Sequence, residues 1–259
     1  MIMKKGQVTI WVIIGILLLA TTTFIIIWQS PNLTKTNEDF TAIESSIHSC
    51  IHSSSENSIV LVGKQGGMYK PTGVEFANHV IPIYYNRGKS TIPDKTTLEK
   101  ELAMAIKKPL DDCLFEIQDP QFIPVLQHTK TNIGKNVVTV EARISLELHE
   151  LIDKESIDNT IIDLYREDII IEYNKLPKIA EEIIEVQQVD KLPVSKIMDI
   201  ATENNVEFEF ITVDDTLLIS LVDNDLFKEP YYFTFGLQYE EKSFDESIRL
   251  QEELNAVIQ

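Results

Sequence analysis

The longest uninterrupted apolar stretch lies close to the N-terminus. From Val8 to Trp28 no side chain is charged, and Val, Ile, Leu, Thr and Phe dominate. A helix of this length, 28 − 8 + 1 = 21 residues, is about 32 Å long, which matches a hydrocarbon core of about 30 Å. Trp11 and Trp28 lie near its ends, where interfacial aromatic side chains are favoured. The pattern predicts a transmembrane anchor within residues 1–30, whereas a buried core helix would rarely lack a polar face for so long.

The charges on either side of this stretch predict its orientation. Lys4 and Lys5 precede it with no acidic residue nearby, and the first charges after it are mixed: Lys35, Glu38 and Asp39. Cytoplasmic flanks of membrane helices carry an excess of basic residues. We therefore expect a cytoplasmic N-terminal stub, a single span that contacts lipid through residues 8–28, and an extracytoplasmic C-terminal region.

The pattern next predicts a linker at residues 31–36 and then two helices joined by a hairpin within residues 37–118. Asn37 is suited to cap the first helix, and the glycine-rich residues 63–67 end it. Residues 81–92 read as a hairpin. Thr96 and Glu99 form a capping box for the second helix. Apolar residues at three- and four-residue spacing give the two helices their buried faces: Phe40, Ile43, Ile47, Cys50 and Ile51, then Leu98, Leu102, Ala105, Ile106 and Leu110.

The remaining residues, 119–259, begin after a proline-containing boundary at 116–124 and predict a second α+β half. Strict alternation over residues 137–149 indicates a strand with one buried face. Further strands are expected at 169–173, 208–212, 217–221 and 231–239, with a proline-interrupted helix at 178–204. Hairpin connections in place of regular strand–helix alternation favour an α+β fold of two small halves with antiparallel sheet.

Composition restricts the partners. The chain has 23 basic and 41 acidic residues, so the region after the anchor lysines carries 21 − 41 = −20 formal charges. Nucleic acid is an unsuitable partner, because phosphate backbones require clustered Lys and Arg. An acidic surface instead favours solubility or basic partners.

Cys50 and Cys113 are the only cysteines, and both lie in the predicted extracytoplasmic region. A disulfide between them would close a loop of about 63 residues and stabilise the fold by about 4 kcal/mol in the chain-entropy model. Two buried thiols are the alternative, because pairing does not follow from sequence alone.

Candidate chemical groups are few. His48 and His52 share one helical face, but Cys50 points about 200° round the helix, so any third metal ligand must come from elsewhere. A solvated helix face is the favoured interpretation. Residues 149–153 and 223–225 only partly match zinc-protease and calcium-loop patterns. No motif pairs a nucleophile with a base, so we expect no catalytic residues, no metal site and no cofactor.

The N-terminal residues Lys4-Lys5-Gly6-Gln7-Val8-Thr9-Ile10, followed directly by the apolar run, resemble an archaeal class III (type IV pilin-like) signal peptide. The resemblance implies cleavage between Gly6 and Gln7, with the apolar helix retained as membrane anchor or filament core. Trp11 occupies the fifth mature position, where many bacterial-type pilins carry glutamate. The spacing of Cys50, the residues 65–67, 83–85 and 93, and Cys113 is also similar to that of uncharacterised archaeal membrane-anchored proteins, which implies no activity.

These features together predict a non-catalytic, membrane-anchored surface protein that binds a protein partner, forms a homo-oligomer or takes part in an envelope assembly. A pilin-like filament subunit is the alternative. A surface hydrolase using carboxylates is the third hypothesis.

Overall fold

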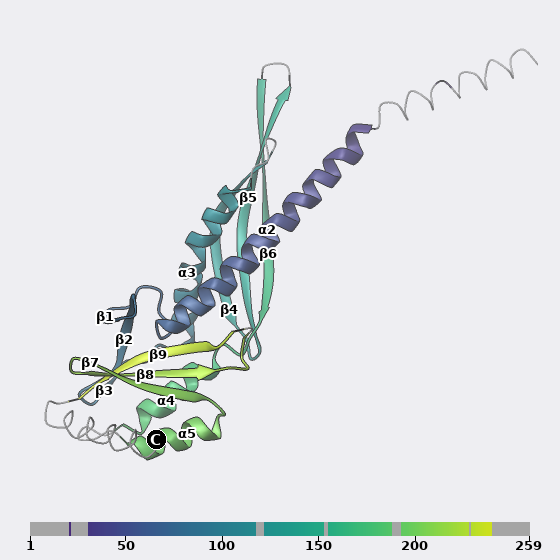
Figure 1. Cartoon of the computed structure of the whole chain (residues 1–259). Coiled ribbons are helices and arrows are strands. Elements are labelled where there is room, and N and C mark those ends of the chain that lie inside the picture. The colour runs from purple at the N-terminus through teal and green to yellow at the C-terminus, as the bar shows by residue number, and fades with distance from the viewer. Residues whose placement is uncertain are drawn as a thin grey trace, which may run out of the picture. The chain divides into compact units, whose positions relative to one another are not determined.

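The computed structural model describes residues 21, 31–117, 122–152, 155–187, 193–227 and 229–239 (Figure 1). The predicted cleavage junction at Gly6 and Gln7, and all of the predicted anchor except Thr21, lie outside the described residues. Within those ranges no helix combines the length and the apolar character needed to cross a membrane. The chain divides into two compact units, residues 1–47 and 48–259, and the second holds both sheets and the candidate sites.

The first described helix, α2, runs from Pro31 to Lys64. The predicted linker at residues 31–36 is therefore helical, a correction that follows from the tolerance of helices for proline in their first turn, where its missing N–H is not needed. The predicted end is confirmed. Gly66 and Gly67 adopt positive φ angles of 63° and 89°, and the Gly67 N–H donates to the Val62 carbonyl at 2.8 Å, which closes the last turn.

The next helix, α3, runs from Lys95 to Phe115, and its predicted apolar face is buried. The predicted capping box at Thr96 is wrong. Asp94 is the N-cap, and its Oδ1 accepts the Thr97 N–H at 2.7 Å. The Glu99 carboxylate accepts the backbone N–H of Ile133 at 2.9 Å, so it contacts a strand instead of the helix start.

A three-stranded antiparallel sheet, in the order β4–β5–β6, packs against α3 through β4. Thr129 and Thr131 donate their hydroxyl hydrogens to the carbonyls of Ala103 and Glu99 of α3, at 3.1 and 2.6 Å. The predicted strand is present as β5, with its alternating residues buried from Val138 to Leu146. The strands β4 and most of β6 were not predicted. The three strands are β4 Phe122–Ile133, β5 Val137–Ile152 and β6 Glu155–Ile170.

The larger sheet has the order β1–β2–β9–β8–β7, with β3 paired to β2. The predicted hairpin at 81–92 is present as β2 and β3, and the three strands predicted within 208–239 are present as β7, β8 and β9. The β1–β2 hairpin was not predicted. The six strands are β1 Gly73–Phe76, β2 His79–Asn86, β3 Lys89–Ser90, β7 Glu207–Val213, β8 Thr216–Asp223 and β9 Tyr231–Gln238.

This sheet is mixed, because β2 and β9 run parallel. The expectation of purely antiparallel sheet is therefore wrong for the larger sheet, although the α+β class is confirmed. The β2–β9 pairing also joins residues 37–118 to residues 119–259, so the two predicted halves share one sheet. Parallel pairing between strands far apart in sequence has no hairpin signature that a sequence pattern could reveal.

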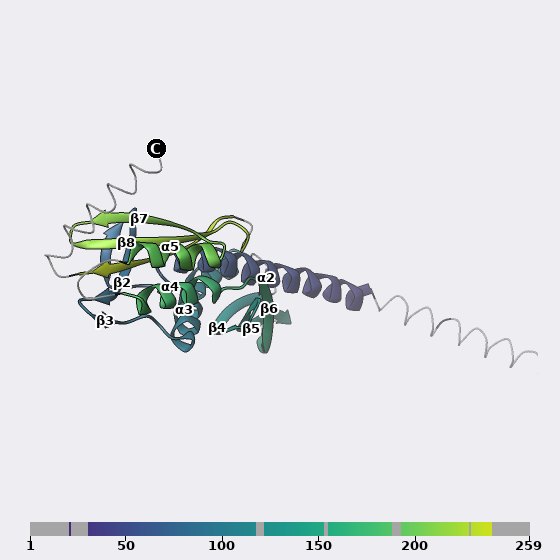
Figure 2. The same ribbon diagram turned by 90° about the horizontal axis from the view of Figure 1, so that it is seen from below.

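The proline-interrupted helix is present as α4, Lys175–Glu185, and α5, Val194–Glu203. Both lie along one side of the larger sheet (Figures 1 and 2). The buried carboxylate of Asp223 on β8 forms an ion pair with Lys175 at the start of α4. Tyr84 of β2 lies 6.1 Å from Phe235 of β9, ring centroid to ring centroid, in a stacked arrangement that is part of the aromatic core.

The predicted pairing of the two cysteines is present. Cys50 of α2 and Cys113 of α3 have their Sγ atoms at a bonding distance of 1.98 Å and their Cα atoms 5.7 Å apart. The bond therefore links the two helices that precede the three-stranded sheet.

Candidate functional site

The two histidines on one face of α2 both contact a carboxylate that lies on another element. The Nδ1 atoms of His48 and His52 lie 3.3 and 3.1 Å from the carboxylate oxygens of Glu167 on β6, and His52 Nε2 lies 3.2 Å from Glu56. Among the described residues no group of three or more His, Cys, Asp or Glu side chains is placed to hold a metal ion. The two histidines and Glu167 join α2 to β6.

The other acidic motifs also have local roles. Asp214 and Asp215 form the β7–β8 turn, where Asp214 has a φ of 52°. Asp223 pairs with Lys175 and accepts the backbone N–H of Asp225 at 2.9 Å, so this segment caps its own loop. The side chains of residues 149–153 lie outside the described part. Asp111 and Asp112 lie in α3 and border a hollow at its end.

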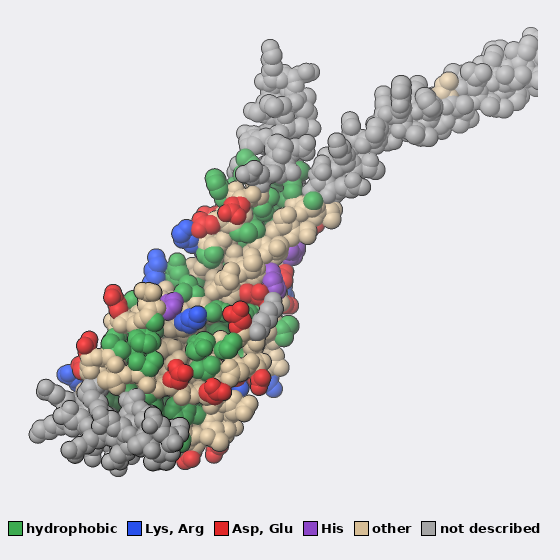
Figure 3. Space-filling view, viewed as in Figure 1, with side chains coloured by type: hydrophobic (Ala, Val, Ile, Leu, Met, Phe, Trp, Pro, Cys, Tyr) green, Lys and Arg blue, Asp and Glu red, His purple; other side chains and the backbone are tan. Residues whose placement is uncertain are grey.

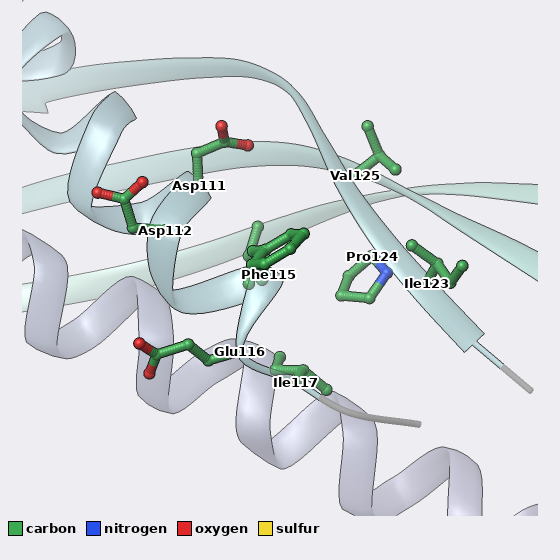
Figure 4. Close-up of a pocket in the computed structure, with 9 residues that line it drawn as sticks. Asp111, Asp112, Phe115, Glu116, Ile117, Ile123, Pro124 and Val125 are labelled. Carbon is green, nitrogen blue, oxygen red and sulfur yellow. The ribbon is translucent and has the colours of Figure 1, made fainter. Parts of the chain in front are cut away.

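The hollow has a volume of about 830 Å³ and lies where α3 ends and β4 begins (Figure 4). Its helix side carries three carboxylates, and its strand side is apolar. Figure 4 shows the Phe115 ring between the last turn of α3 and Pro124 of β4. The lining residues are Asp111, Asp112, Leu114, Phe115, Glu116, Ile117, Ile123, Pro124 and Val125.

Large apolar side chains in this hollow are open to solvent. Phe115 is 88% exposed and Ile123 is 44% exposed. Single exposed apolar residues are common on protein surfaces, but a contiguous group indicates a binding surface.

Further exposed apolar side chains lie on the same face of the sheet, on β6, and the polar residues Arg143 and Ser145 of β5 separate them from the hollow. Val125 of β4 pairs with Ser145 of β5, which pairs with Ile162 of β6, so these three side chains share one face of the sheet. Ile162 is 62% exposed, and Leu164, two residues further along the same face, is 56% exposed. We call the side chains of Phe115, Ile123, Val125, Ile162 and Leu164 the open face.

The opposite face of the same sheet is covered. Tyr165 and Ile169 of β6 are buried, and Glu167 between them reaches the two histidines of α2. The strand β6 therefore carries apolar side chains on both faces. One face packs inside the domain, and no helix covers the other within the described residues. Ile162 and Leu164 therefore expose apolar surface to water, and burial of that surface against a partner would be favourable.

Acidic groups border the open face. Asp112 accepts a hydrogen bond from Lys108 at 2.6 Å, and this bond raises the pKa of the Lys108 amine. Asp111 and Glu116 form no ion pair with any other described residue. Figure 3 shows acidic side chains spread between hydrophobic ones over the viewed surface. The border of the hollow is therefore negatively charged.

Sequence reasoning missed the open face, although part of its signal was present. Residues 161–170 of β6 place apolar side chains at both even and odd positions: Ile162, Leu164 and Ile170, and Tyr165 and Ile169. A strand that is apolar on both faces is expected to be packed against other elements, or against a partner, on both faces. Phe115 carries no such signal, because a single apolar residue at a helix end is unremarkable in sequence.

Comparisons with protein-family models, curated proteins and solved structures found no match for this chain.

Proposed function

We propose that this chain is a non-catalytic, membrane-anchored surface protein whose extracytoplasmic domain binds a protein partner through the open face. The observation that carries this proposal is the group of exposed apolar side chains of Phe115, Ile123, Ile162 and Leu164, together with the carboxylates of Asp111 and Glu116, which form no ion pair within the described residues. Burial of apolar surface is the main favourable term in protein association.

The proposed location is supported by the N-terminal sequence and by the disulfide. Residues 8–28 have the length and composition of a single span, and Lys4 and Lys5 favour a cytoplasmic N-terminus. Disulfide bonds persist in oxidising compartments and are rare in the cytosol. The bond between Cys50 and Cys113 is consistent with a domain outside the cytoplasm.

The chemistry of the open face selects the partner. Asp111 and Glu116 favour a partner that presents Lys or Arg beside its apolar contact residues. A second copy of this chain fits less well, because each copy carries about −20 charges in the same region and like charges repel. We therefore expect a different protein with a basic, apolar surface.

Site-specific photo-crosslinking in the source cells tests the proposal. A photo-reactive amino acid at Ile162 should give one major crosslinked product, and the same group at Glu181, an exposed residue of α4, should not. Phe115→Ser should lower the yield at Ile162 without loss of folding, because Phe115 is almost fully exposed. Equal products at Ile162 and Glu181, or no product at either, would contradict the proposal.

The same experiment addresses the alternative, a pilin-like filament subunit, which is favoured by the class III-like N-terminus. A filament would give ladders of the chain crosslinked to itself, and cells without the chain would lose a filament visible by electron microscopy. A single product with a second protein would instead support partner binding.

Processing of the N-terminus is tested separately. If a prepilin-type peptidase reads the Gly6–Gln7 junction, mass spectrometry of the membrane form should find Gln7 as the first residue, and Gly6→Val should block the cut. An intact N-terminus at Met1 would leave an ordinary uncleaved anchor, and the partner-binding proposal would stand.

A further inference from the structure

A second hollow, on the larger sheet, has the features of a small-ligand site. It has a volume of about 410 Å³, within the range of about 300–1,000 Å³ found for ligand pockets. The strands β1, β2, β7, β8 and β9 and the end of α2 supply its walls. We call it the sheet groove, and its lining residues are Lys64, Phe76, Ala77, His79, Ile81, Glu209, Ile211, Ser220, Tyr232 and Thr234.

Two hydroxyl groups lie side by side in the sheet groove. Ser220 of β8 pairs in register with Thr234 of β9, and their hydroxyl oxygens are 3.0 Å apart. Each residue is only 7% exposed. One hydroxyl must donate to the other, so one hydroxyl hydrogen has no acceptor among the described residues. A buried donor without an acceptor is costly, and a ligand oxygen in the groove would satisfy it.

The sheet groove also has charges of opposite sign. Lys64, the last residue of α2, has its Nζ atom 6.0 Å from the ring centroid of Tyr232 on β9. Glu209 lies on β7, in register with Ser220. Neither Lys64 nor Glu209 forms an ion pair within the ranges that the structure describes. Both charges are therefore available to a ligand.

The separation of the two charges limits the length of that ligand. Tyr232 and Glu209 lie on strands that are separated by β8, and two strand spacings amount to about 10 Å. An extended peptide spans about 3.5 Å per residue, so two or three residues bridge about 7–11 Å. A free amino acid, whose two charges lie on one residue, is too short to reach both ends.

We infer that the sheet groove binds a short zwitterionic peptide of two or three residues with free termini. Lys64 binds the terminal carboxylate, and Glu209 binds the terminal ammonium group. A peptide carbonyl accepts the free hydroxyl hydrogen of the Ser220–Thr234 pair. Phe76, Ile81 and Ile211 provide an apolar wall for a side chain of the peptide. This site is separate from the open face and does not depend on the proposed function.

Isothermal titration calorimetry of the full-length chain with the tripeptide Ala-Phe-Ala tests the inference. Blocking either terminus, by N-acetylation or C-amidation, should weaken binding by at least about tenfold, because a charge-assisted hydrogen bond is lost. Lys64→Gln should weaken binding of the free tripeptide by a similar factor, and so should Glu209→Gln. Lys70→Gln is the matched control, because Lys70 also stands over a tyrosine ring, at 5.1 Å from Tyr69, but outside the groove.

Measuring the blocked peptides against the two variants identifies which terminus of the peptide binds Lys64 and which binds Glu209. Lys64→Gln should no longer distinguish the amidated from the free peptide, and Glu209→Gln should no longer distinguish the acetylated from the free peptide. The inference is overturned if the unmodified chain shows no binding at about 10 mM tripeptide, which would place the affinity below the weakest useful range. It is equally overturned if the blocked peptides bind as well as the free one, or if Lys70→Gln has the same effect as Lys64→Gln.

Discussion

Removal of the disulfide between Cys50 and Cys113 should lower the free energy of unfolding by about 4 kcal/mol. The bond closes a loop with a sequence separation of 63 residues. In the chain-entropy model, closing such a loop removes about 14 cal/mol/K from the denatured ensemble, which corresponds to about 4 kcal/mol at 25 °C. The folded state contributes little to this difference, because alanine at either position fits where a cysteine lies.

Urea denaturation of four proteins measures the effect: the unmodified chain, Cys50→Ala, Cys113→Ala and the double variant. The bond is lost in every variant, so each single variant should lose nearly as much stability as the double variant. The dependence of stability on urea concentration should become steeper, because the denatured chain is no longer held compact by the loop.

Two results would refute this reasoning. Losses in the single variants that add up to the loss in the double variant would mean that the cysteines act independently and are not bonded. A double variant that loses less than about 1 kcal/mol would mean that the loop constraint does not stabilise the fold by the proposed mechanism.

Leu102→Ala, at a fully buried position of α3, should cost about 2–5 kcal/mol of unfolding free energy in urea, and an effect below about 1 kcal/mol would contradict the packing. Burial raises the pKa values of Tyr173 and Tyr231. The free energy of unfolding should therefore be unaffected by these groups below about pH 10 and should fall above it. In an ultraviolet titration, the two phenol groups should ionise only when the chain unfolds. Glu167→Gln should cost less than about 1 kcal/mol, because both histidine contacts are partly exposed, and a loss of several kcal/mol in urea would argue against this.

Local patterns predicted the helices and the strands that have one buried face. The residues from Val138 to Leu146 alternate so regularly that β5 follows directly, and the apolar spacing of α3 gave its buried face. The N-cap was misplaced by two residues, because Asp94 and Thr96 are both suitable capping residues and Glu99 happened to complete the pattern with Thr96.

The missed strands had misleading local signals. The prolines around the start of β4 suggested a domain boundary, although Pro124 lies within an outer strand of its sheet, where proline is tolerated. Acidic residues are frequent in β6, so only its last residues were predicted. Asp163 and Glu167 lie on the same side of the strand as the buried Tyr165 and Ile169, and Glu167 meets His48 and His52 there.

The candidate sites required tertiary structure. The histidines of α2 were visible in the sequence, but their partner lies 119 residues from His48. The open face arises because β4 and β6 lie on either side of β5, and the sheet groove arises because β7, β8 and β9 assemble beside β1 and β2. The local pattern of apolar and polar residues does not show which of these strands and helices become neighbours.

The position of the disulfide connects the redox state of the chain to the open face. Cys113 lies in the last turn of α3, two residues before Phe115, and the bond fixes this turn to α2. Without the bond, the end of α3 is held by fewer contacts, and helix ends are the first parts of a helix to fray. The Phe115 side of the hollow should then become less ordered, even in molecules that remain folded. We predict that Cys50→Ala/Cys113→Ala lowers the photo-crosslinking yield at Ile162 under conditions in which circular dichroism shows a folded chain. An unchanged yield would mean that the open face forms independently of the bond, and the disulfide would then serve stability alone.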